Sequence, residues 1–292
     1  MTSSIEKAAE RLGGRKADPE QGGAAPTAPQ APGIGAEPGA EGALSERDTL
    51  CRLDFETLRQ QGYLTPNSTQ SQLAEEMRLL KRPLLRNAFG KGAAPIHHGN
   101  LIAVTSALPG EGKTFTTLNL AMSMAMEMDT TVLMVDSDVV KPSLTRLLRL
   151  EEEPGLTDVL AHPEMDLGSV IVPTDLPKLR VVPAGRRHSH STELLASEQM
   201  EQVAFELSRR YPDRVVLFDA PPLLVTSQAG VLSSLVGQVL VVVEAGRTSQ
   251  SAVKEAVSHL DQDKVIGMVL NKGRRGIGGD YYYGGYYGSY GE

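Results

Sequence analysis

Short apolar runs that alternate with longer amphipathic stretches dominate this chain from residue 101 to residue 271. The runs are rich in β-branched residues and almost continuously apolar, which is typical of parallel strands buried on both faces. We therefore expect an α/β fold with a mostly parallel sheet covered by helices on both faces. The predicted strands are LIAVTS from Leu101, TVLMVD from Thr131, LRVVPAG from Leu179, RVVLFD from Arg214, QVLVVVEAG from Gln238 and KVIGMVLN from Lys264.

A glycine-rich turn joins the first predicted strand to the helix predicted after it, in LIAVTSALPGEGKTFTTLNLAMSMA. The turn reads A-x-x-x-x-G-K-T, a P-loop with alanine at its first position. Glycines in such a turn let backbone N–H groups surround phosphate oxygens at a helix N-terminus. The sequence thus predicts a P-loop NTPase, whose nucleotide contacts are Pro109, Gly110, Glu111, Gly112, Lys113, Thr114 and Phe115.

Carboxylates close two further predicted strands, with Asp136 and Asp138 after one and Asp219 after the other. The carboxyl ends of parallel strands share the edge of the sheet at which ligands bind. We expect Lys113 to reach the β- and γ-phosphates, and Thr114, Asp136 and Asp219 to hold Mg²⁺. Asp136 and Asp138 are both candidates for orienting or deprotonating an attacking hydroxyl, so the predicted catalytic group is Lys113, Asp136, Asp138 and Asp219.

Asn271 ends the last predicted strand and begins the stretch NKGR. This stretch resembles the guanine-reading pattern N-K-x-D, but Arg274 stands where that pattern has its acidic residue. GTP is therefore disfavoured, and we expect the Asn271 amide to contact the adenine of ATP.

The chain ends are predicted to differ from this core. Residues 13–44 are mostly Gly, Ala, Pro and Glu with no periodic apolar pattern, which predicts disorder. A helix is expected where Leu73, Met77, Leu80 and Leu84 recur, with Pro83 ending or kinking it. The predicted division is a largely disordered N-terminal arm at 1–60, a helical oligomerisation segment at 61–95, a P-loop domain at 96–271 and a flexible tyrosine-rich tail at 272–292.

Composition excludes several classes of function. A net charge of −7 and a pI near 5.5 argue against nucleic acid as a partner. Cys51 is the only cysteine, which suits a reducing cytosol and is interpreted as an unreactive thiol. We find no apolar h-region at the start and no run near the ~20 apolar residues that span a bilayer, so we expect a cytoplasmic chain that meets membranes through a partner.

The tail DYYYGGYYGSYGE carries six of the eight tyrosines in the chain, spaced by glycine. Glycine spacers let a mobile acceptor reach a rigid phosphate site. The candidate phosphoacceptors are Tyr281, Tyr282, Tyr283, Tyr286, Tyr287 and Tyr290.

From about Gln61 to its end, the chain resembles the bacterial tyrosine autokinases of exopolysaccharide synthesis, particularly their soluble, exosortase-associated type. SALPGEGKT, VLMVDSD, VVLFDAPP and the tyrosine-rich tail carry the resemblance. It implies an ATP- and Mg²⁺-dependent tyrosine kinase that phosphorylates the tails of neighbouring subunits in a homo-oligomeric ring. It also implies activation by a membrane-embedded polysaccharide chain-length regulator, reversal by a phosphotyrosine phosphatase, and a location peripheral to the inner membrane.

Two positions depart from the pattern of this family. Its subunit-contact motif E-x-x-R-x-x-R corresponds here to Glu75, Arg78 and Lys81, and lysine lacks the planar fork of arginine. Val140 stands where many relatives carry a basic residue.

Two other functions fit parts of the sequence. One is a non-kinase ATPase switch of the septum-site and partition type, which shares the strand-end aspartates. Such ATPases typically carry a lysine where this chain has Leu108, and that difference favours the kinase. The other is a nucleotide-binding scaffold whose tyrosines only bind partners.

Overall fold

The computed structural model describes residues 50–68, 70–210, 213–261 and 263–273. Seven strands within these ranges form one sheet in the order β3-β4-β2-β5-β1-β6-β7. Every pairing is parallel except that of β3 with β4, so the predicted mostly parallel sheet is confirmed. The strands are β1 (Leu101–Ser106), β2 (Thr131–Asp136), β3 (Val172–Pro173), β4 (Leu179–Val182), β5 (Arg214–Asp219), β6 (Gln238–Glu244) and β7 (Val265–Asn271).

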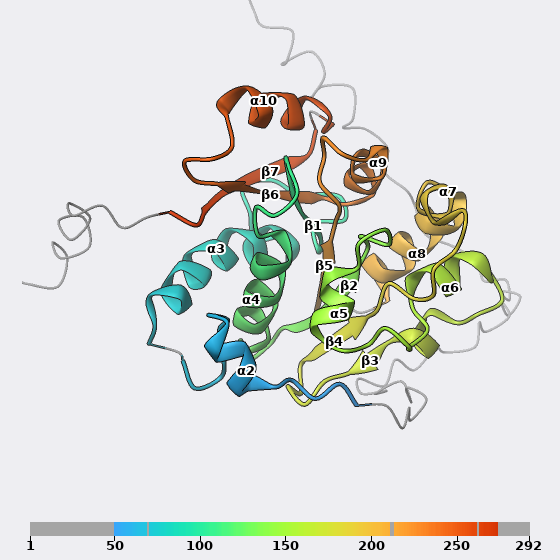
Figure 1. The fold of residues 1–292 in the computed structure, drawn as a ribbon, viewed down its shortest axis with the longest axis horizontal. Helices are drawn as coiled ribbons and strands as arrows, with labels where there is room; N and C mark the ends of the chain where they lie inside the picture. The colour runs from blue at the N-terminus through green and yellow to red at the C-terminus, as the bar shows by residue number, and fades with distance from the viewer. Residues whose placement is uncertain (1–49, 69, 211–212, 262, 274–292) are drawn as a thin grey trace, which may run out of the picture. The chain divides into compact units, whose positions relative to one another are not determined.

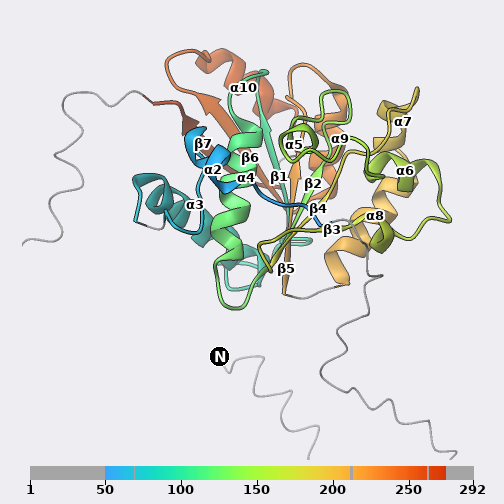
Figure 2. The same ribbon diagram turned by 60° about the horizontal axis from the view of Figure 1, so that its bottom comes forward.

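Helices cover both faces of the sheet (Figures 1 and 2). One face packs against α3 and α4, with α2 and α5 alongside, and the other packs against α6 to α10. Their bounds are α2 (Phe55–Gln60), α3 (Gln72–Ala88), α4 (Lys113–Ala125), α5 (Ser143–Leu147), α6 (Leu156–Ala161), the 3-10 helix η1 (Leu167–Val170), α7 (Ser191–Leu195), α8 (Glu198–Arg209), α9 (Ser227–Leu235) and α10 (Gln250–Ser258).

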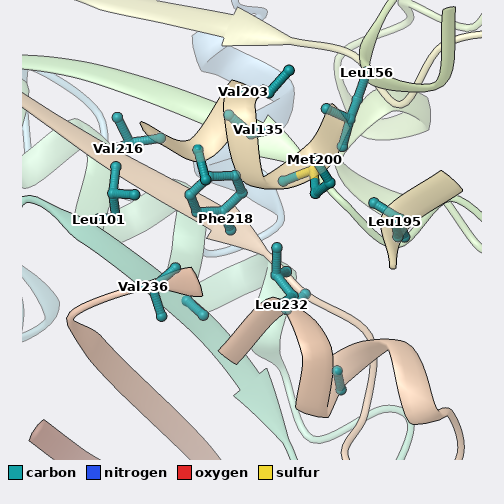
Figure 3. Close-up of a cluster of buried hydrophobic side chains, with 14 of the residues drawn as sticks. Leu101, Val135, Leu156, Leu195, Met200, Val203, Val216, Phe218, Leu232 and Val236 are labelled. Atoms are coloured by element: carbon teal, nitrogen blue, oxygen red, sulfur yellow. The ribbon is translucent and has the colours of Figure 1, made fainter. Parts of the chain in front are cut away.

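The two cores follow from the alternation of side chains along each strand. In β1, Leu101 faces the cluster that contains Met200 of α8 and Leu232 of α9, as Figure 3 shows. Its neighbour Ile102 faces the opposite cluster, with Leu118 of α4. Both faces of the central strands are therefore buried, which explains their continuous apolar sequences.

The helix α3 continues past Pro83, so the proline does not end it, whereas a kink at this position stays a prediction. Ser71 caps its first turn by accepting from the N–H of Ala74 at 3.2 Å. Met77 and Leu84 are buried on either side of the proline, in the cluster that α3 shares with α4. Packing of this apolar face keeps the helix continuous where propensity predicts a break.

The part of the chain before α3 is ordered earlier than residue 60. Cys51 bridges to Thr174 beside β3, and α2 follows with its N-terminus capped by Asp54. Residues 50–60, placed by the sequence in the disordered arm, therefore pack on the sheet, and Leu53 and Leu58 join its core. The rest of the predicted arm, residues 1–49, lies outside the described residues.

No helix in the described ranges combines the length and the apolar character needed to cross a membrane.

Candidate active site

The P-loop occupies residues 107–112, between the end of β1 and the start of α4. Gly110 and Gly112 have φ angles of 86° and 101°, in the left-handed region that side chains disfavour. At Gly112 a Cβ atom would also overlap the Asn271 side-chain nitrogen. Glycine at 112 is therefore favoured by its conformation, and an added Cβ would have to displace the Asn271 amide. The loop leads its backbone into the N-terminus of α4.

Lys113, the first residue of α4, is buried and faces carboxylates. Its ammonium donates to Asp138 Oδ2 at 2.9 Å and lies 3.8 Å from Asp219 Oδ1. Burial alone lowers the pKa of Lys113, but the charges of Asp219 and Asp138 outweigh it and raise the pKa above its ordinary value. The lysine is thus positively charged and is held where the P-loop joins α4.

Asp219 is fully buried at the end of β5. It accepts from the Thr114 hydroxyl at 2.7 Å and from the Thr117 hydroxyl at 3.4 Å. Burial raises its pKa, although Lys113 and Thr114 act in the opposite direction. The Thr114 hydroxyl and the Asp219 carboxylate, predicted to share Mg²⁺, therefore already lie in contact.

Asp136 pairs in register with Asp219 across β2 and β5. Its Oδ2 accepts from both the N–H and the hydroxyl of Thr145, each at 2.7 Å. Burial and the charge of Asp219 raise its pKa to about 7. Asp136 thus holds α5 against the sheet, and its hydrogen-bonding capacity is largely used within the chain.

A pocket of about 450 Å³ opens beside the loop, within the 300–1,000 Å³ typical of ligand sites. Lys113, Thr114 and Asp138 line it, whereas Asp136, Asp219 and Asn271 do not. The complete lining is Tyr63, Pro109, Gly110, Gly112, Lys113, Thr114, Phe115, Asp138, Val140, Lys141, Ser143, Leu147, Pro221, Pro222, Val225 and Thr226. Of the two candidate bases, Asp138 is the one that a bound group can reach.

The side chain of Glu111 attaches the loop to β6, and the predicted contact of Glu111 with nucleotide stays a prediction. Its side chain is buried and accepts from the N–H of Leu108 at 2.6 Å, the N–H of Glu244 at 3.3 Å and the hydroxyl of Thr248. Three donors from two segments converge on this one carboxylate. The Glu111 side chain therefore ties the P-loop to the end of β6 and to Thr248. The sequence offered no signal for this, since Glu244 and Thr248 lie more than a hundred residues away.

The end of β7 also holds the loop. Asn271 donates its side-chain amide to the carbonyl of Glu111 at 2.8 Å. Lys272 donates to the carbonyl of Gly110 at 2.6 Å and pairs with Glu244 at 3.2 Å. The contact of Asn271 with adenine stays a prediction, whereas its contact with the loop is observed.

Tyr63 was not predicted as a site residue. Its ring lies 4.9 Å from that of Phe115, centroid to centroid, and both residues line the pocket. Burial and the charge of Asp219 raise the pKa of Tyr63, so the phenol stays neutral near pH 7. The sequence feature that could have drawn attention to Tyr63 is its distance from the other tyrosines, since only Tyr63 and Tyr211 lie outside the tail.

The three residues predicted for subunit contact differ in exposure. Glu75 and Arg78 form an ion pair on the surface of α3. Lys81 is buried, donates to the carbonyl of Ser123 at 2.6 Å and pairs with Glu127 at 2.6 Å. Its ammonium is therefore engaged inside the chain. The six tail tyrosines lie outside the described residues.

The donor set suits a magnesium nucleotide. The left-handed glycines, the helix N-terminus and Lys113 provide a cradle for phosphate, and the Thr114 hydroxyl and Asp219 carboxylate are hard oxygen ligands. Within the described residues no cluster of three or more His, Cys, Asp or Glu side chains can hold a metal ion. Mg²⁺ bound here would therefore depend on water and phosphate oxygens as well as on protein, as is usual for this ion.

Comparison with known proteins agrees with this geometry. A family model described as an AAA domain matches residues 99–265. The tyrosine-protein kinase YwqD of Bacillus subtilis is 30% identical over 190 residues, which are 64% of this chain and 77% of YwqD. The chain belongs to the bacterial tyrosine-protein kinases. This membership confirms the predicted family and class of enzyme.

Other members of the bacterial tyrosine-protein kinases differ in length and in similarity. The kinase Ptk of Acinetobacter johnsonii is 31% identical over 182 residues, 62% of this chain and only 24% of Ptk.

Among solved structures, the kinase domain of VpsO has a TM-score of 0.55 at 28% identity, covering 70% of this chain and all of that one. The septum site-determining protein MinD of Pyrococcus horikoshii, complexed with Mg-ADP, has a TM-score of 0.50 at 23% identity over 62% of this chain and 74% of that one, which shows a shared fold.

Proposed function

We propose that this chain is an ATP- and Mg²⁺-dependent autokinase that phosphorylates the tyrosines of its tail. The observation that carries the proposal is the position of Asp138, which contacts the P-loop lysine and lines the same pocket. A phosphoryl group placed on Lys113 and an acceptor hydroxyl placed beside Asp138 would be neighbours. Membership in the tyrosine-kinase family supports this reading of the geometry.

The roles of the residues follow from their contacts. In the proposed reaction Lys113 and the loop N–H groups neutralise and orient the β- and γ-phosphates. Asp138 accepts the proton of the tyrosine hydroxyl. At the same time the tyrosine oxygen bonds to the γ-phosphorus, and ADP departs. Thr114 and Asp219 would hold Mg²⁺, which supplies charge neutralisation on the phosphates.

The acceptors in this proposal are the six tail tyrosines, which begin nine residues after Lys272. An extended segment gains up to ~3.3–3.6 Å per residue, so both the chain's own site and a neighbour's are within reach. Transfer between subunits of a homo-oligomeric ring, with Glu75 and Arg78 at the contact, is the arrangement we favour. Each phosphate would add about −1.5 to −2 charge and repel neighbouring subunits, so that phosphorylation would promote disassembly.

The wider role is also a proposal. We place the chain in the cytoplasm at the inner membrane, held there by a membrane-embedded polysaccharide chain-length regulator that activates it. In this role it regulates exopolysaccharide synthesis and export, and a phosphotyrosine phosphatase resets it. The division into a lead-in segment, kinase domain and acceptor tail belongs to the same proposal.

The experiment is to incubate the purified full chain with ATP and Mg²⁺, with and without a candidate activator segment, and to locate phosphate by mass spectrometry. Tail phosphotyrosine that is lost in Lys113→Ala and kept in Lys254→Ala is expected. Lys254 is a suitable control because it lies on α10 and does not line the pocket beside the loop. ATP hydrolysis with an unmodified tail would instead support the ATPase switch, and nucleotide binding without either reaction would support the scaffold.

A mixing experiment separates transfer within a chain from transfer between chains. A Lys113→Ala chain with an intact tail is mixed with an active chain whose six tail tyrosines are changed to phenylalanine. Phosphate on the inactive chain is expected for transfer between subunits, whereas an unmodified mixture would require transfer within one chain.

A further inference from the structure

The pocket beside the P-loop has more apolar lining than phosphate binding requires. Lys113 and Thr114 mark the phosphate position, and the same pocket is lined by Phe115, Val140 and Leu147. Val140 lies on the rim of this pocket and is 60% exposed. An apolar group of a ligand would cover this surface.

The predicted position of the base leaves this lining free. Asn271, the predicted adenine contact, donates to the carbonyl of Glu111 and sits against Gly112. It does not line the pocket, so a base bound at Asn271 would lie apart from the apolar lining. On that prediction, the apolar part is available to the group that receives the phosphate.

Two aromatic rings from distant segments meet in this part of the pocket. Tyr63 comes from the loop between α2 and α3, and Phe115 from the first turn of α4. Their centroids lie 4.9 Å apart at an interplanar angle of 44°, a tilted arrangement within the distance range of aromatic pairs. Such a pair offers an aromatic surface to a third ring.

A polar group in the same pocket also lacks a partner. Within the described residues, the buried Thr226 hydroxyl oxygen makes no hydrogen bond, and Thr226 lines the pocket. A buried hydroxyl without a partner costs free energy. Because this oxygen is itself buried, a ligand in the pocket would reach it only after Thr226 changed its rotamer.

We propose that Tyr63 and Phe115 form an acceptor wall, against which the ring of the tyrosine to be phosphorylated packs. Val140 and Leu147 complete its apolar surface, and Asp138 receives the phenolic proton. The wall selects tyrosine because serine and threonine have no ring to pack against it. This inference rests on the proposed function, and it assigns to Tyr63 a positioning role in recognising the acceptor.

The test measures acceptor binding without catalysis. A full chain whose six tail tyrosines are changed to serine prevents competition from its own tail. A non-hydrolysable ATP analogue and Mg²⁺ occupy the nucleotide site, and a fluorescent peptide of residues 280–292 is titrated by anisotropy. The matched peptide has serine at all six tyrosine positions and is not expected to bind.

In this background Tyr63→Leu is expected to weaken peptide binding about 2- to 12-fold, the range for loss of one aromatic pair. Tyr63→Phe keeps the ring and should restore binding, whereas Phe115→Leu should behave like Tyr63→Leu. The control is Phe205→Leu, because Phe205 is a half-exposed ring on α8 that does not line this pocket. Affinity for the nucleotide analogue should stay within twofold in Tyr63→Leu, Tyr63→Phe and Phe205→Leu, which change no predicted nucleotide contact.

Three results would overturn the acceptor wall: no binding of the tyrosine peptide, equal binding by the Tyr63→Leu chain, or a loss of nucleotide affinity in place of peptide affinity. Phosphate found on Tyr63 itself in the kinase assay would make it an acceptor and also refute the wall. Failure of the proposed function has a different signature. Peptide binding would depend on Tyr63, yet no phosphotyrosine would form with ATP.

Discussion

The Lys113 ammonium lies 2.9 Å from the Asp138 carboxylate, and both side chains are buried. Without nucleotide, Asp138 therefore pairs with the positive charge of Lys113 that a bound phosphate would need. Asp138→Asn removes one negative charge from the site, so we expect ADP to bind several-fold more tightly in the absence of Mg²⁺. Phosphotransfer should fall about 10²- to 10⁴-fold, the range for loss of a general base. Calorimetry and a phosphotyrosine assay would measure the two effects.

Asp136→Asn provides the comparison within the same site, and Asp261→Asn provides a surface control. Asp136 is held by Thr145 and does not line the pocket, so its variant should lose less phosphotransfer than Asp138→Asn. A pKa raised to about 7 would nevertheless suit Asp136 for proton transfer. An equal or greater loss in Asp136→Asn would move the base role to that residue.

Alanine at the two loop glycines should have unequal effects. Both positions have positive φ, so either substitution incurs a strain of about 1–2 kcal/mol. Only at Gly112 does the added Cβ also meet the side chain of Asn271, since nothing lies within 4 Å of a Cβ at Gly110. Gly112→Ala should therefore reduce the free energy of unfolding more than Gly110→Ala, as measured in urea. The double variant Gly112→Ala, Asn271→Ala should lose less free energy of unfolding than the sum of the two single variants. If the losses simply add, the overlap with Asn271 is not the cause.

Lys81 and Arg78 should separate folding from assembly. Lys81 donates to the Ser123 carbonyl near the end of α4, and Lys81→Met leaves that buried acceptor without its donor. The loss should be about 1–3 kcal/mol in free energy of unfolding. Arg78→Ala should leave unfolding nearly unchanged and lower the oligomer mass in light scattering. An unaltered mass in Arg78→Ala would argue against α3 as the subunit contact.

Cys51 should resist alkylation while the chain is folded. Burial, with a smaller effect from the Asp175 charge, raises its pKa from 9.0 to about 11, so near pH 8 its thiolate fraction falls roughly 100-fold. The neutral thiol's contribution to stability is present below pH 9 and is lost as pH rises towards 11. Iodoacetamide labelling of native and urea-unfolded chain at pH 8 would measure the difference. Similar rates would show that the native thiol is accessible.

The central strands could be predicted from sequence because burial on both faces leaves a strong local pattern. β1, β2 and β5 end where their apolar runs end, and two of these runs place Asp136 and Asp219 at one edge. β3 was missed because it contains two residues, one of them Pro173, and pairs only with β4 at the edge of the sheet. A strand so short carries no periodic signal.

The site was predictable where a motif is contiguous and not where distant segments meet. The P-loop could be read from one stretch, whereas the bond of Glu111 to Thr248 joins residues far apart in the sequence. The tilted contact between the rings of Tyr63 and Phe115 likewise joins residues far apart in the sequence. Such contacts depend on how α2, α3 and β6 pack, which periodicity does not specify.

Pro83 tests the same balance between local propensity and packing. It lies inside α3 and is exposed, and it has no N–H to donate to the carbonyl of Leu79 one turn earlier. Proline in a helix interior costs about 3 kcal/mol relative to alanine, although it also restricts the unfolded chain by about 0.4–1 kcal/mol. Pro83→Ala should therefore increase the free energy of unfolding by about 2–3 kcal/mol in urea denaturation, and the neighbouring Arg82→Ala should change it little. A lower free energy of unfolding in Pro83→Ala would mean that the proline packs favourably in α3. The backbone of α3 would then already accommodate the proline without the expected cost.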